Sequence, residues 1–541
     1  MTRRQILGAL AVAPFLPAAE LPDGLFERHD AAVDASLPRQ ILDPDSRGYG
    51  NFQTADGIFW AGPAAGFVNQ AMAAHLHPKS KHYNSTLLVE RMRLAMKAME
   101  ALQDTDGFID LPVTNFSSPP DTGFVVHNLG TAACLAQRAN RRDLVALLEP
   151  FLRKAGNGMA IGGVHTPNHR WVVSSALAQI HEVFPDSRYL KRIEQWLAEG
   201  IDIDSDGQFT ERSTTVYNSI CDIAFVTLAE KLKRPALLDA PRKNLEAMMY
   251  LLHPDLEVVT EISRRQDRNE RGDMGRYWFP LQYFAVRERN PVYAGLARHF
   301  APKYASLATL MEYPELLGTM PAGAPPPQDF EKSFPQLGIA RIRRGQRSAT
   351  LIGNNSLLFN LRNRDTVITG VRMAGAFYGK GQLIPGDLKK VGASYQLTQS
   401  LEAGYYQPLD KPRPVHANEW GEVRTERRIS QVSRITQTAT ITETPRGFRV
   451  TLASKGTPNV PVSIEIGLRE GTKVEGAIAA GPGVYALPAG TATVGGNIQI
   501  GPGLGAHKYF QVRGAEAKLP GTSLYLTAFS PFEHTIEFEC L

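Results

Sequence analysis

The chain is 541 residues long, 43% of them hydrophobic and 21% charged, and its net charge is +5. This length exceeds what one ordinary hydrophobic core supports, so two or three domains are expected, and the composition excludes an intrinsically disordered chain. The mild positive charge suits an anionic ligand. It lacks the dense Lys and Arg clustering of nucleic-acid-binding proteins, so no nucleic-acid partner is expected.

The N-terminal segment has the order of an export signal. Arg3 and Arg4 precede an apolar run that ends at Leu16, and small residues follow it. A basic start, a short apolar stretch and small residues predict a signal peptide over 1–19, and the arginine pair favours the twin-arginine type. A periplasmic or secreted protein is therefore expected. No other stretch is long and apolar enough to predict a membrane span.

The segment 20–317 has the pattern of a helical domain. Apolar residues recur with helical spacing, and turns rich in Gly, Pro and Asp separate the periodic runs. The predicted helices cover 84–102, 123–138, 144–152, 168–184, 189–197, 215–232 and 242–252, with further helices within 274–287 and 291–304. Such hairpins close into a toroid or stack into a solenoid. An incomplete α/α toroid is expected because it would gather the motif-bearing loops at one mouth.

Two segments of this helical region resemble each other. Residues 104–110 read D-T-D-G-F-I-D and residues 204–210 read D-S-D-G-Q-F-T, each before a predicted helix. They indicate an internal repeat. Residues 202–207 also imitate the start of a calcium-binding loop, D-x-D-x-D-G, but Ser213 stands where that loop needs a bidentate Glu. An EF-hand calcium site is therefore not expected.

The composition changes near residue 318. A Pro-rich segment, 318–330, predicts a stiff linker. The remaining chain, 331–541, has β-branched residues, alternation and Gly, Asn and Pro punctuation, which predict a largely antiparallel β-sandwich. The predicted strands are 348–352, 356–361, 438–444, 447–453, 462–468, 491–495, 523–528 and 534–539.

The cysteines give no sign of a disulfide framework or a zinc site. Cys134, Cys221 and Cys540 are odd in number and widely spaced. The first two lie in apolar helical patterns and are predicted to be buried core thiols. No cofactor is expected, and a structural metal is left open. The motifs of serine hydrolases, P-loop proteins and nicotinamide-binding proteins are also missing from the sequence.

The first candidate motif is Pro167-Asn168-His169, at the start of a predicted helix whose apolar face includes Trp171. Asn168 is a good N-cap residue, and capping alone would explain it. A helix N-terminus also offers free N–H groups and positive potential, so an Asn amide and a His there could bind a carboxylate. Both interpretations stay open at this point.

The second candidate motif runs from Asp206-Gly207 through Glu211 and Arg212 to Tyr217. Three hydroxyl residues, 213–215, are possible caps for the helix that carries Tyr217. A tyrosine there is compatible with ordinary core packing as well as with a site. A basic stretch, 264–276, follows later in the chain, and Arg264 and Arg265 are the residues that best suit anion binding.

These motifs resemble those of the α/α-toroid polysaccharide lyases, especially the heparinase II/III-like and oligoalginate lyase group. Asn168-His169 resembles the group's Asn-His pair at the start of a toroid helix. Residues 206–211, D-G-Q-F-T-E, followed by Tyr217, resemble its D-G-x-[FY]-x-E…Y segment. Residues 261–264, E-I-S-R, more distantly resemble the arginine motif of hyaluronate and chondroitin AC lyases.

The resemblance extends over about 80–540 in architecture and 165–220 in motifs. It implies a toroid followed by a β-sandwich and an acidic polysaccharide as the partner. The histidine-bearing β-domain motif of heparinase III-like enzymes does not occur, and G-N-N-S stands at 353–356 instead. Arg212 stands where several relatives carry Gly or His.

The resemblance implies β-elimination at a uronic acid. Tyr217, His169 and Asn168 are the expected catalytic residues, and the expected substrate-binding residues are Arg264, Arg265, Arg212, Glu211 and Trp171. The amide, the imidazole and the arginines would neutralise the carboxylate next to the C5 proton. Either Tyr217 or His169 could remove that proton, and the sequence does not choose between them.

Two other functions fit the same architecture. A glycoside hydrolase would use two carboxylates, from Asp206, Glu211 or Asp110. A non-catalytic periplasmic glycan-binding protein would bind saccharides without turnover. The identity of the uronate, endo or exo action and the oligomeric state do not follow from the sequence.

Overall fold

The computed structural model describes residues 21–541, so the predicted signal peptide, 1–19, lies outside the described residues. The chain divides into two compact units. The first, helical unit runs to residue 252 and from 256 to 326, and the second, β unit comprises 253–255 and 327–541. The change at 326–327 falls within the segment 318–330. A helical region followed by an antiparallel β region confirms the predicted fold class.

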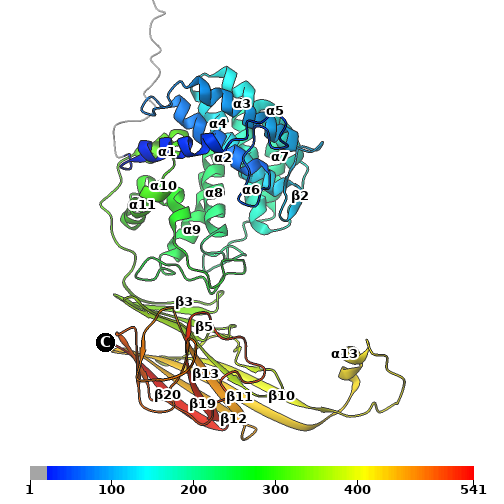
Figure 1. Ribbon diagram of the computed structural model, residues 1–541, viewed down its shortest axis with the longest axis vertical. Helices are drawn as coiled ribbons and strands as arrows, with labels where there is room; N and C mark the ends of the chain where they lie inside the picture. The colour runs from blue at the N-terminus through cyan, green and yellow to red at the C-terminus, as the bar shows by residue number, and fades with distance from the viewer. Residues whose placement is uncertain (1–20) are drawn as a thin grey trace, which may run out of the picture. The chain divides into compact units, whose positions relative to one another are not determined.

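The helical unit is a succession of hairpins (Figure 1). Its helices are α1 (Leu25–Ser36), α2 (Ala61–Leu76), α3 (Thr86–Leu102), α4 (Pro119–Arg138), α5 (Arg142–Met159), α6 (Pro167–Val183), α7 (Ser187–Ala198), α8 (Tyr217–Leu232), α9 (Asp239–Met248), α10 (Trp278–Arg287), α11 (Pro291–Tyr304) and α12 (Leu307–Glu312). A short hairpin, β1 (Ile109–Leu111) with β2 (Asn115–Ser118), precedes α4. None of the helices in residues 21–541 has the length and apolar character needed to cross a bilayer.

Burial separates inner from outer helices. Helices α2, α4, α6 and α8 pack against one another in succession and are buried on nearly every side. Helix α7 buries only one side, through Tyr189 and Ile193. A helix covered all round needs small or apolar residues everywhere, which explains the Ala-rich sequence of α2. The predicted thiols Cys134 and Cys221 lie in α4 and α8 and are buried, as expected.

The repeated Asp-Gly segments form the same loop. In each, the first Asp donates its N–H to the carbonyl oxygen four residues later, at 2.8 Å in 104–108 and 2.9 Å in 204–208. Gly107 and Gly207 have φ of 97° and 81°, which side chains rarely tolerate. A third loop, 54–58, has the same pattern, with a bond of 3.1 Å. The loops lie between successive helices and set where each next segment begins.

The β unit contains two large sheets. Its strands are β3 (Asp329–Phe334), β4 (Ile339–Arg344), β5 (Arg347–Ile352), β6 (Phe359–Asn363), β7 (Thr366–Gly375), β8 (Gly381–Gln382), β9 (Lys389–Val391), β10 (Ser394–Tyr406), β11 (Ile429–Thr444), β12 (Gly447–Gly456), β13 (Pro461–Leu468), β14 (Val474–Glu475), β15 (Ile478–Gly481), β16 (Val484–Ala486), β17 (Ala492–Val494), β18 (Ile498–Gly501), β19 (Thr522–Phe529) and β20 (Phe532–Cys540). One sheet has the order β14-β17-β18-β20-β12-β11-β10-β9 and the other β15-β16-β19-β13-β7-β6-β5-β4-β3, with β8 paired to β7. The pair β16–β19 is parallel.

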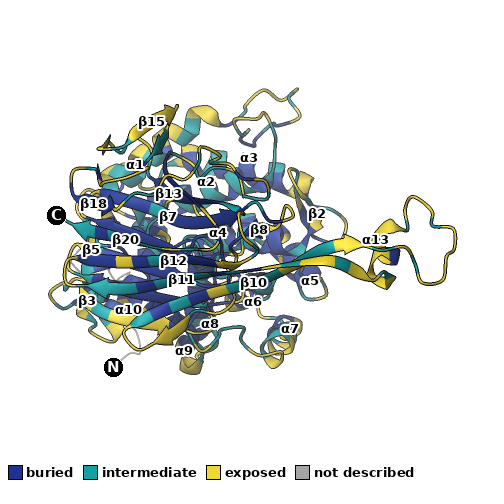
Figure 2. Ribbon diagram, turned by 90° about the horizontal axis from the view of Figure 1, so that it is seen from below, coloured by how far each residue is buried: buried dark blue, intermediate teal, exposed yellow. Residues whose placement is uncertain are grey.

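Both sheets contribute to one apolar core, which includes Leu351, Ile441, Phe448 and Ile464. Strands β10 and β11 extend beyond their neighbours as a ribbon that carries the short helix α13 (Trp420–Val423), seen as a projecting arm in Figure 2. The arm is coloured largely as exposed, in contrast to the buried central strands. The helix contains Trp420, which is 51% exposed.

Candidate active site

The first motif begins helix α6. Thr166 is the residue before the helix, and Asn168 is the second residue within it. The N-cap interpretation of Asn168 is therefore wrong. Its amide Nδ2 instead donates to Glu211 Oε2 at 3.0 Å, and its Oδ1 accepts from Thr166 Oγ1 at 3.1 Å. The amide is buried and held in one orientation, and it joins the two sequence motifs across a separation of 43 residues.

Glu211 is positioned by the repeated loop. The loop ends at Phe209, and Arg212 follows Glu211 with a φ of 52°. The Glu211 side chain is 7% exposed, and burial raises the pKa of its carboxyl group, a shift that the nearby Arg265 guanidinium opposes. Arg265 Nε lies 3.8 Å from Glu211 Oε2. One carboxylate thus orients both an amide and a guanidinium.

Tyr217 is the first residue of α8, and its backbone N–H donates to Ser213 Oγ at 3.1 Å. Its phenol oxygen accepts from Gln266 Nε2 at 2.9 Å and from Arg265 Nη2 at 3.4 Å. The Arg265 guanidinium also lies over the ring, 4.7 Å from the centroid. The contacts therefore link Asn168, Glu211, Arg265 and Tyr217 in one chain.

Asp267 connects the loop that carries Arg264 and Arg265 to the start of α8 through hydrogen bonds. The residue is 5% exposed, and its carboxylate accepts from Ser213 Oγ at 3.0 Å, from Thr215 N at 3.1 Å and from Thr215 Oγ1 at 2.8 Å. It also accepts a hydrogen bond from Ser263 Oγ. A buried carboxylate with four such partners holds a loop in one conformation. Arg265 and Gln266 are thereby held next to Tyr217.

His169 lies beside this network on α6 and is 6% exposed. Burial, with contributions from His165 and Arg265, lowers the pKa of His169 to about 4, although Asp121 acts in the opposite direction. The rings of His165 and His169 meet edge to face, with centroids 4.7 Å apart. Within residues 21–541, Nδ1 of His169 is buried and makes no hydrogen bond. The imidazole is therefore neutral near pH 7.

The other predicted binding residues differ in their surroundings. Arg264 is exposed. Its backbone N–H donates to the Glu211 carbonyl oxygen at 3.1 Å, and its side-chain Nη1 donates to the Thr210 carbonyl oxygen at 3.4 Å. Arg212 is partly buried, and burial lowers the pKa of its guanidinium. Both are close in sequence or space to Glu211.

Trp171 is placed differently from the prediction. It is fully buried, its Nε1 donates to Asp202 Oδ1 at 2.8 Å, and its ring packs against Phe225 with centroids 4.8 Å apart. The Arg170 guanidinium lies over the Trp171 ring, 4.5 Å from its centroid. A ring enclosed in this way offers no face to a saccharide, so Trp171 is a packing residue.

Sequence reasoning missed several residues of the network, namely Asp267, Gln266 and His165. The first two follow Arg265 directly, but a run of alternating acids and bases is typical of a solvated loop, so nothing indicated that Asp267 is buried. His165 precedes the helix by two residues and lies one turn from His169. That spacing is the signal that could have identified it.

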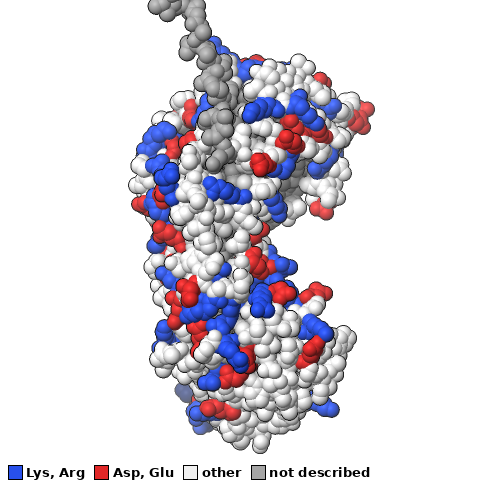
Figure 3. Space-filling model, turned by 90° about the vertical axis from the view of Figure 1, so that its left-hand side faces the viewer, with Lys and Arg blue, Asp and Glu red and all other residues white. Residues whose placement is uncertain are grey.

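Charge over the surface is mixed. On the face drawn in Figure 3, Lys and Arg side chains are interspersed with Asp and Glu.

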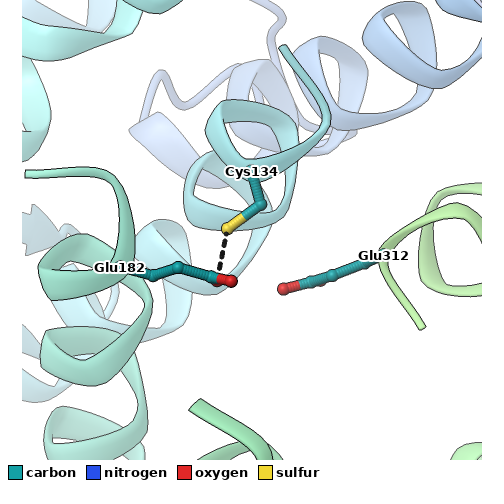
Figure 4. A group of neighbouring side chains, drawn as sticks. All are labelled: Cys134, Glu182 and Glu312. Carbon is teal, nitrogen blue, oxygen red and sulfur yellow. Dashed lines mark hydrogen bonds between the residues drawn. The ribbon is translucent and has the colours of Figure 1, made fainter. Parts of the chain in front are cut away.

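A second cluster of polar side chains lies within the helical unit. Cys134, Glu182 and Glu312 offer ligand atoms within 4.8 Å of one another, and Figure 4 shows them converging from separate helices. Lys231 Nζ pairs with Glu182 and lies 2.7 Å from Glu312 Oε1 and 3.6 Å from Cys134 Sγ. Lys231 and Arg138, whose Nη2 lies 3.7 Å from Glu182 Oε1, thus balance the two carboxylates, and the donor set does not suit a metal ion.

Comparison with known proteins identifies the fold. No protein-family model matches the chain, and no curated protein does. Among solved structures, a xanthan lyase from Paenibacillus is 9% identical over 98% of this chain and 58% of its own, with a TM-score of 0.59. A chondroitin AC lyase from Streptomyces coelicolor A3, in complex with chondroitin sulphate, is 12% identical over 97% of this chain and 80% of its own, with a TM-score of 0.58.

These likenesses concern the fold. The chain has the α/α-toroid plus β-sandwich architecture, which confirms the predicted fold class. It spans 58% of the length of the xanthan lyase, so that protein has regions without a counterpart here. A family 76 glycoside hydrolase from a bovine Bacteroides thetaiotaomicron strain is 11% identical over 55% of this chain and 77% of its own, with a TM-score of 0.36, too low to support an inference.

Proposed function

We propose that the protein is a polysaccharide lyase that cleaves a uronic-acid-containing polysaccharide by β-elimination. The observation that carries the proposal is the chain of contacts from Asn168 through Glu211 and Arg265 to Tyr217, with a neutral His169 beside it. These side chains supply hydrogen-bond donors for a carboxylate and a phenol for proton transfer, the two requirements of elimination at a uronate. The solved structures of similar fold named above are lyases of xanthan and chondroitin.

The carboxylate of the substrate would be bound by side chains around Glu211, beginning with the Asn168 amide. An amide nitrogen has two hydrogens, and Asn168 Nδ2 gives one to Glu211. The second is available to a substrate oxygen, and His169 and Arg264 add further donors. Neutralising the carboxylate makes the adjacent C5 proton acidic enough to be removed, because the negative charge that develops is stabilised in place.

Proton transfer is assigned to Tyr217 rather than His169. An imidazole with a pKa of about 4 is a weak base, so it is poorly suited to accept a proton from carbon. The phenol oxygen of Tyr217 lies next to two donors, one of them cationic. As a phenolate, Tyr217 takes the C5 proton, the C5–H electrons form the C4–C5 double bond, and the C4–O4 bond breaks. The phenol then returns its proton to the departing O4, so no water is consumed.

Within the lyases, we assign the chain to the heparinase II/III-like and oligoalginate lyase group. The Asn168-His169 pair and the D-G-Q-F-T-E segment, 206–211, support this assignment. Export through a twin-arginine signal at 1–19 is part of the same proposal, and the order of Arg3 and Arg4 before the apolar run supports it. Replacing Arg3 and Arg4 with Lys should leave the protein in the cytoplasmic fraction, and unchanged export would exclude the twin-arginine route.

The test is the ultraviolet absorbance of a 4,5-unsaturated uronate during incubation with alginate, glucuronan, hyaluronan, chondroitin or heparan. We expect absorbance to rise with one of these polymers and to stay flat with Tyr217→Phe, which keeps the ring but lacks the hydroxyl. New reducing ends without absorbance would identify hydrolysis instead. Saturable binding without either product would identify a glycan-binding protein.

A further inference from the structure

Three exposed tyrosines lie near the base of the arm that β10 and β11 form. Tyr378 is 43% exposed, Tyr405 60% and Tyr509 46%, so a ligand can reach each ring, unlike the enclosed ring of Trp171. All three belong to the β unit, whereas Tyr217 and its partners belong to the helical unit. We call the area that the three rings occupy the tyrosine surface.

The turn between β7 and β8 holds Tyr378 beside Tyr405, where the arm leaves the sandwich (Figure 2). Their rings meet edge to face with centroids 5.8 Å apart, and Tyr378 Oη lies 3.4 Å from Ser433 Oγ. Tyr378 has a φ of 51°, in a turn closed by the Lys380 N–H and the Phe377 carbonyl oxygen at 3.0 Å. A bulky residue is rare in this left-handed region and remains there only where its surroundings fix it, which is common at ligand sites. The fold therefore fixes the position of this ring.

Tyr509 is fixed in the loop between β18 and β19. Its backbone N–H donates to His507 Nδ1 at 3.2 Å, and its Oη accepts from the Arg513 backbone N–H at 2.8 Å. A Cβ on Gly514 would lie 2.5 Å from the carbonyl carbon of Gly379, so this loop packs directly on the turn between β7 and β8. The tyrosine surface is therefore continuous across the two segments.

The charge of the tyrosine surface is positive. Its segments, 376–381, 402–406, 429–434 and 505–514, contain the charged residues Lys380, Arg434, Lys508, Arg513 and Glu402. Arg434 pairs with Glu402 at 2.7 Å, and the next acid along the loop, Glu516, pairs with Arg372 at 3.0 Å. Within residues 21–541, the other three cations form no ion pair with a carboxylate, and all three are exposed. An excess of three cations is complementary to an anionic ligand.

The density and placement of these cations indicate the class of ligand. Nucleic acid carries a phosphate at every nucleotide and requires denser Lys and Arg clusters. The centre of a protein interface is apolar and depleted of charge, whereas here Arg513 stands between Tyr509 and the turn of Tyr378. A polymer of sugar acids combines dispersed carboxylates with pyranose C–H faces, and such faces pack on exposed aromatic rings.

We propose that the tyrosine surface binds an acidic polysaccharide, with sugar rings on the three tyrosines and carboxylates near the three cations that lack a carboxylate partner. It holds the chain without cleaving it, since its residues have no counterpart of the Tyr217 network. The proposal does not rest on elimination, because a hydrolase or a glycan-binding protein would use the same surface. Its effect is to keep a polymer attached to the β unit.

Two adjacent tyrosines allow a matched test of the rings. Tyr405 and Tyr406 are consecutive in β10, so their side chains point to opposite faces, and Tyr406 lies beside Arg424 with its ring centroid 5.6 Å from the guanidinium. Both are exposed, so Tyr405→Ala and Tyr406→Ala each remove a ring without opening the core. Only the first removes part of the tyrosine surface.

The contribution of charge has its own matched pair. Lys380→Gln removes one of the three cations, and Lys455→Gln removes an exposed lysine of β12 outside the tyrosine surface. Both variants lower the net charge by one, so a difference between them reflects position and not total charge.

The experiment is affinity electrophoresis of the mature chain in native gels that contain alginate or hyaluronan. Dextran is the neutral control, and poly-L-glutamate supplies carboxylates without sugar rings. All proteins carry Tyr217→Phe so that the polymer stays intact. We expect at least one acidic polysaccharide to retard the chain more than either control. Tyr405→Ala should weaken this binding about tenfold and Lys380→Gln about threefold, while Tyr406→Ala and Lys455→Gln retain it.

The proposal is overturned if neither acidic polysaccharide retards the chain, if poly-L-glutamate retards it equally, or if Tyr405→Ala and Tyr406→Ala behave alike. Retardation that Asn168→Ala abolishes and Tyr405→Ala leaves unchanged would assign the polymer to the helical unit and overturn it too. The absorbance assay with the unmodified chain tests elimination separately, so either proposal can fail without the other.

Discussion

Arg265 has three roles at the candidate site that depend on different atoms. Its Nη2 contacts the Tyr217 phenol oxygen, its Nε faces Glu211, and its guanidinium plane covers the Tyr217 ring. Arg265→Gln removes the positive charge while keeping a polar side chain. We expect kcat to fall by about 10²–10³-fold, as when one preorganised donor to developing charge is lost. The matched control is Arg268→Gln, an exposed arginine of the same loop, which should leave kcat unchanged.

Burial of His169 has a consequence for stability. Its pKa is lowered from 6.5 to about 4 in the folded protein, so between these values the unfolded chain binds more protons than the folded one. The free energy of unfolding should therefore fall as pH decreases from about 6.5 to about 4, by up to roughly 3 kcal/mol from this group. His169→Gln should reduce the loss between pH of about 7.5 and about 4.5, as measured by urea denaturation. An identical loss in both proteins would contradict a neutral His169.

Glu211 distinguishes elimination from hydrolysis. In the proposed lyase it orients Asn168 and Arg265, and in a hydrolase it would be one of two essential carboxylates. Glu211→Gln keeps a hydrogen-bond acceptor for Asn168, so we expect product formation to fall by about tenfold to a hundredfold but to persist. The measurement is initial rate on the polymer identified by the absorbance panel. Complete loss, with the fold intact by circular dichroism, would favour a catalytic carboxylate.

At the scale of elements, the Asp-Gly loops decide where the site residues stand. A Cβ on Gly207 would lie 2.6 Å from the Lys243 carbonyl oxygen, in addition to the strain of a φ of 81°. Gly57 occupies the same place in its loop, with a φ of 74°, but its Cβ would meet nothing closer than 4.0 Å. Gly57→Ala should cost about 1–2 kcal/mol. Gly207→Ala should cost more, roughly 3–5 kcal/mol. Chemical denaturation compares them, and equal costs would contradict the clash.

Much of the order of helices and strands was predictable, because the hydrophobic periodicity of a segment can be recognised without knowing its tertiary contacts. The predicted helix 84–102 nearly coincides with α3, and 462–468 with β13. Strand β4 was missed because its sequence, I-A-R-I-R-R, reads as exposed and basic. Arg341 is instead fully buried and donates to Ala349 O at 3.0 Å and Thr350 Oγ1 at 2.7 Å. Such burial depends on partners from the next strand, which local propensity does not contain.

The sequence proposed the residues of the candidate site but not the contacts between them. Asn168, His169, Glu211, Arg265 and Tyr217 were all proposed as site residues from the sequence, and the structure places them close together. Their hydrogen bonds were not, because those bonds depend on which helices become neighbours. Capping chemistry favoured Asn168 as an N-cap, and its bond to Glu211 comes from a segment 43 residues away. Tertiary contacts outweighed the local preference there.

At the scale of the whole chain, Lys231 forms ion pairs with Glu182 and Glu312, and these contacts join helices that are far apart in sequence. Lys231 is on α8, Glu182 on α6 and Glu312 on α12, and the Lys231 side chain is 3% exposed. Lys231→Met removes one charge and leaves a buried carboxylate without its partner. We expect the free energy of unfolding to fall by about 3–5 kcal/mol. Lys233→Met, whose side chain is 84% exposed, should change it little, and equal effects would contradict a structural role for the cluster.

The central claim is that the chain breaks its polymer without water, with the Tyr217 network carrying the proton. The most direct test is to digest the polymer in water enriched in heavy oxygen and to weigh the products by mass spectrometry. Elimination predicts a product pair in which one end is unsaturated and neither carries the label at the cleaved linkage. One heavy oxygen incorporated per broken linkage, at the new reducing end, with no unsaturated product, would show that the bond is hydrolysed and would contradict the account.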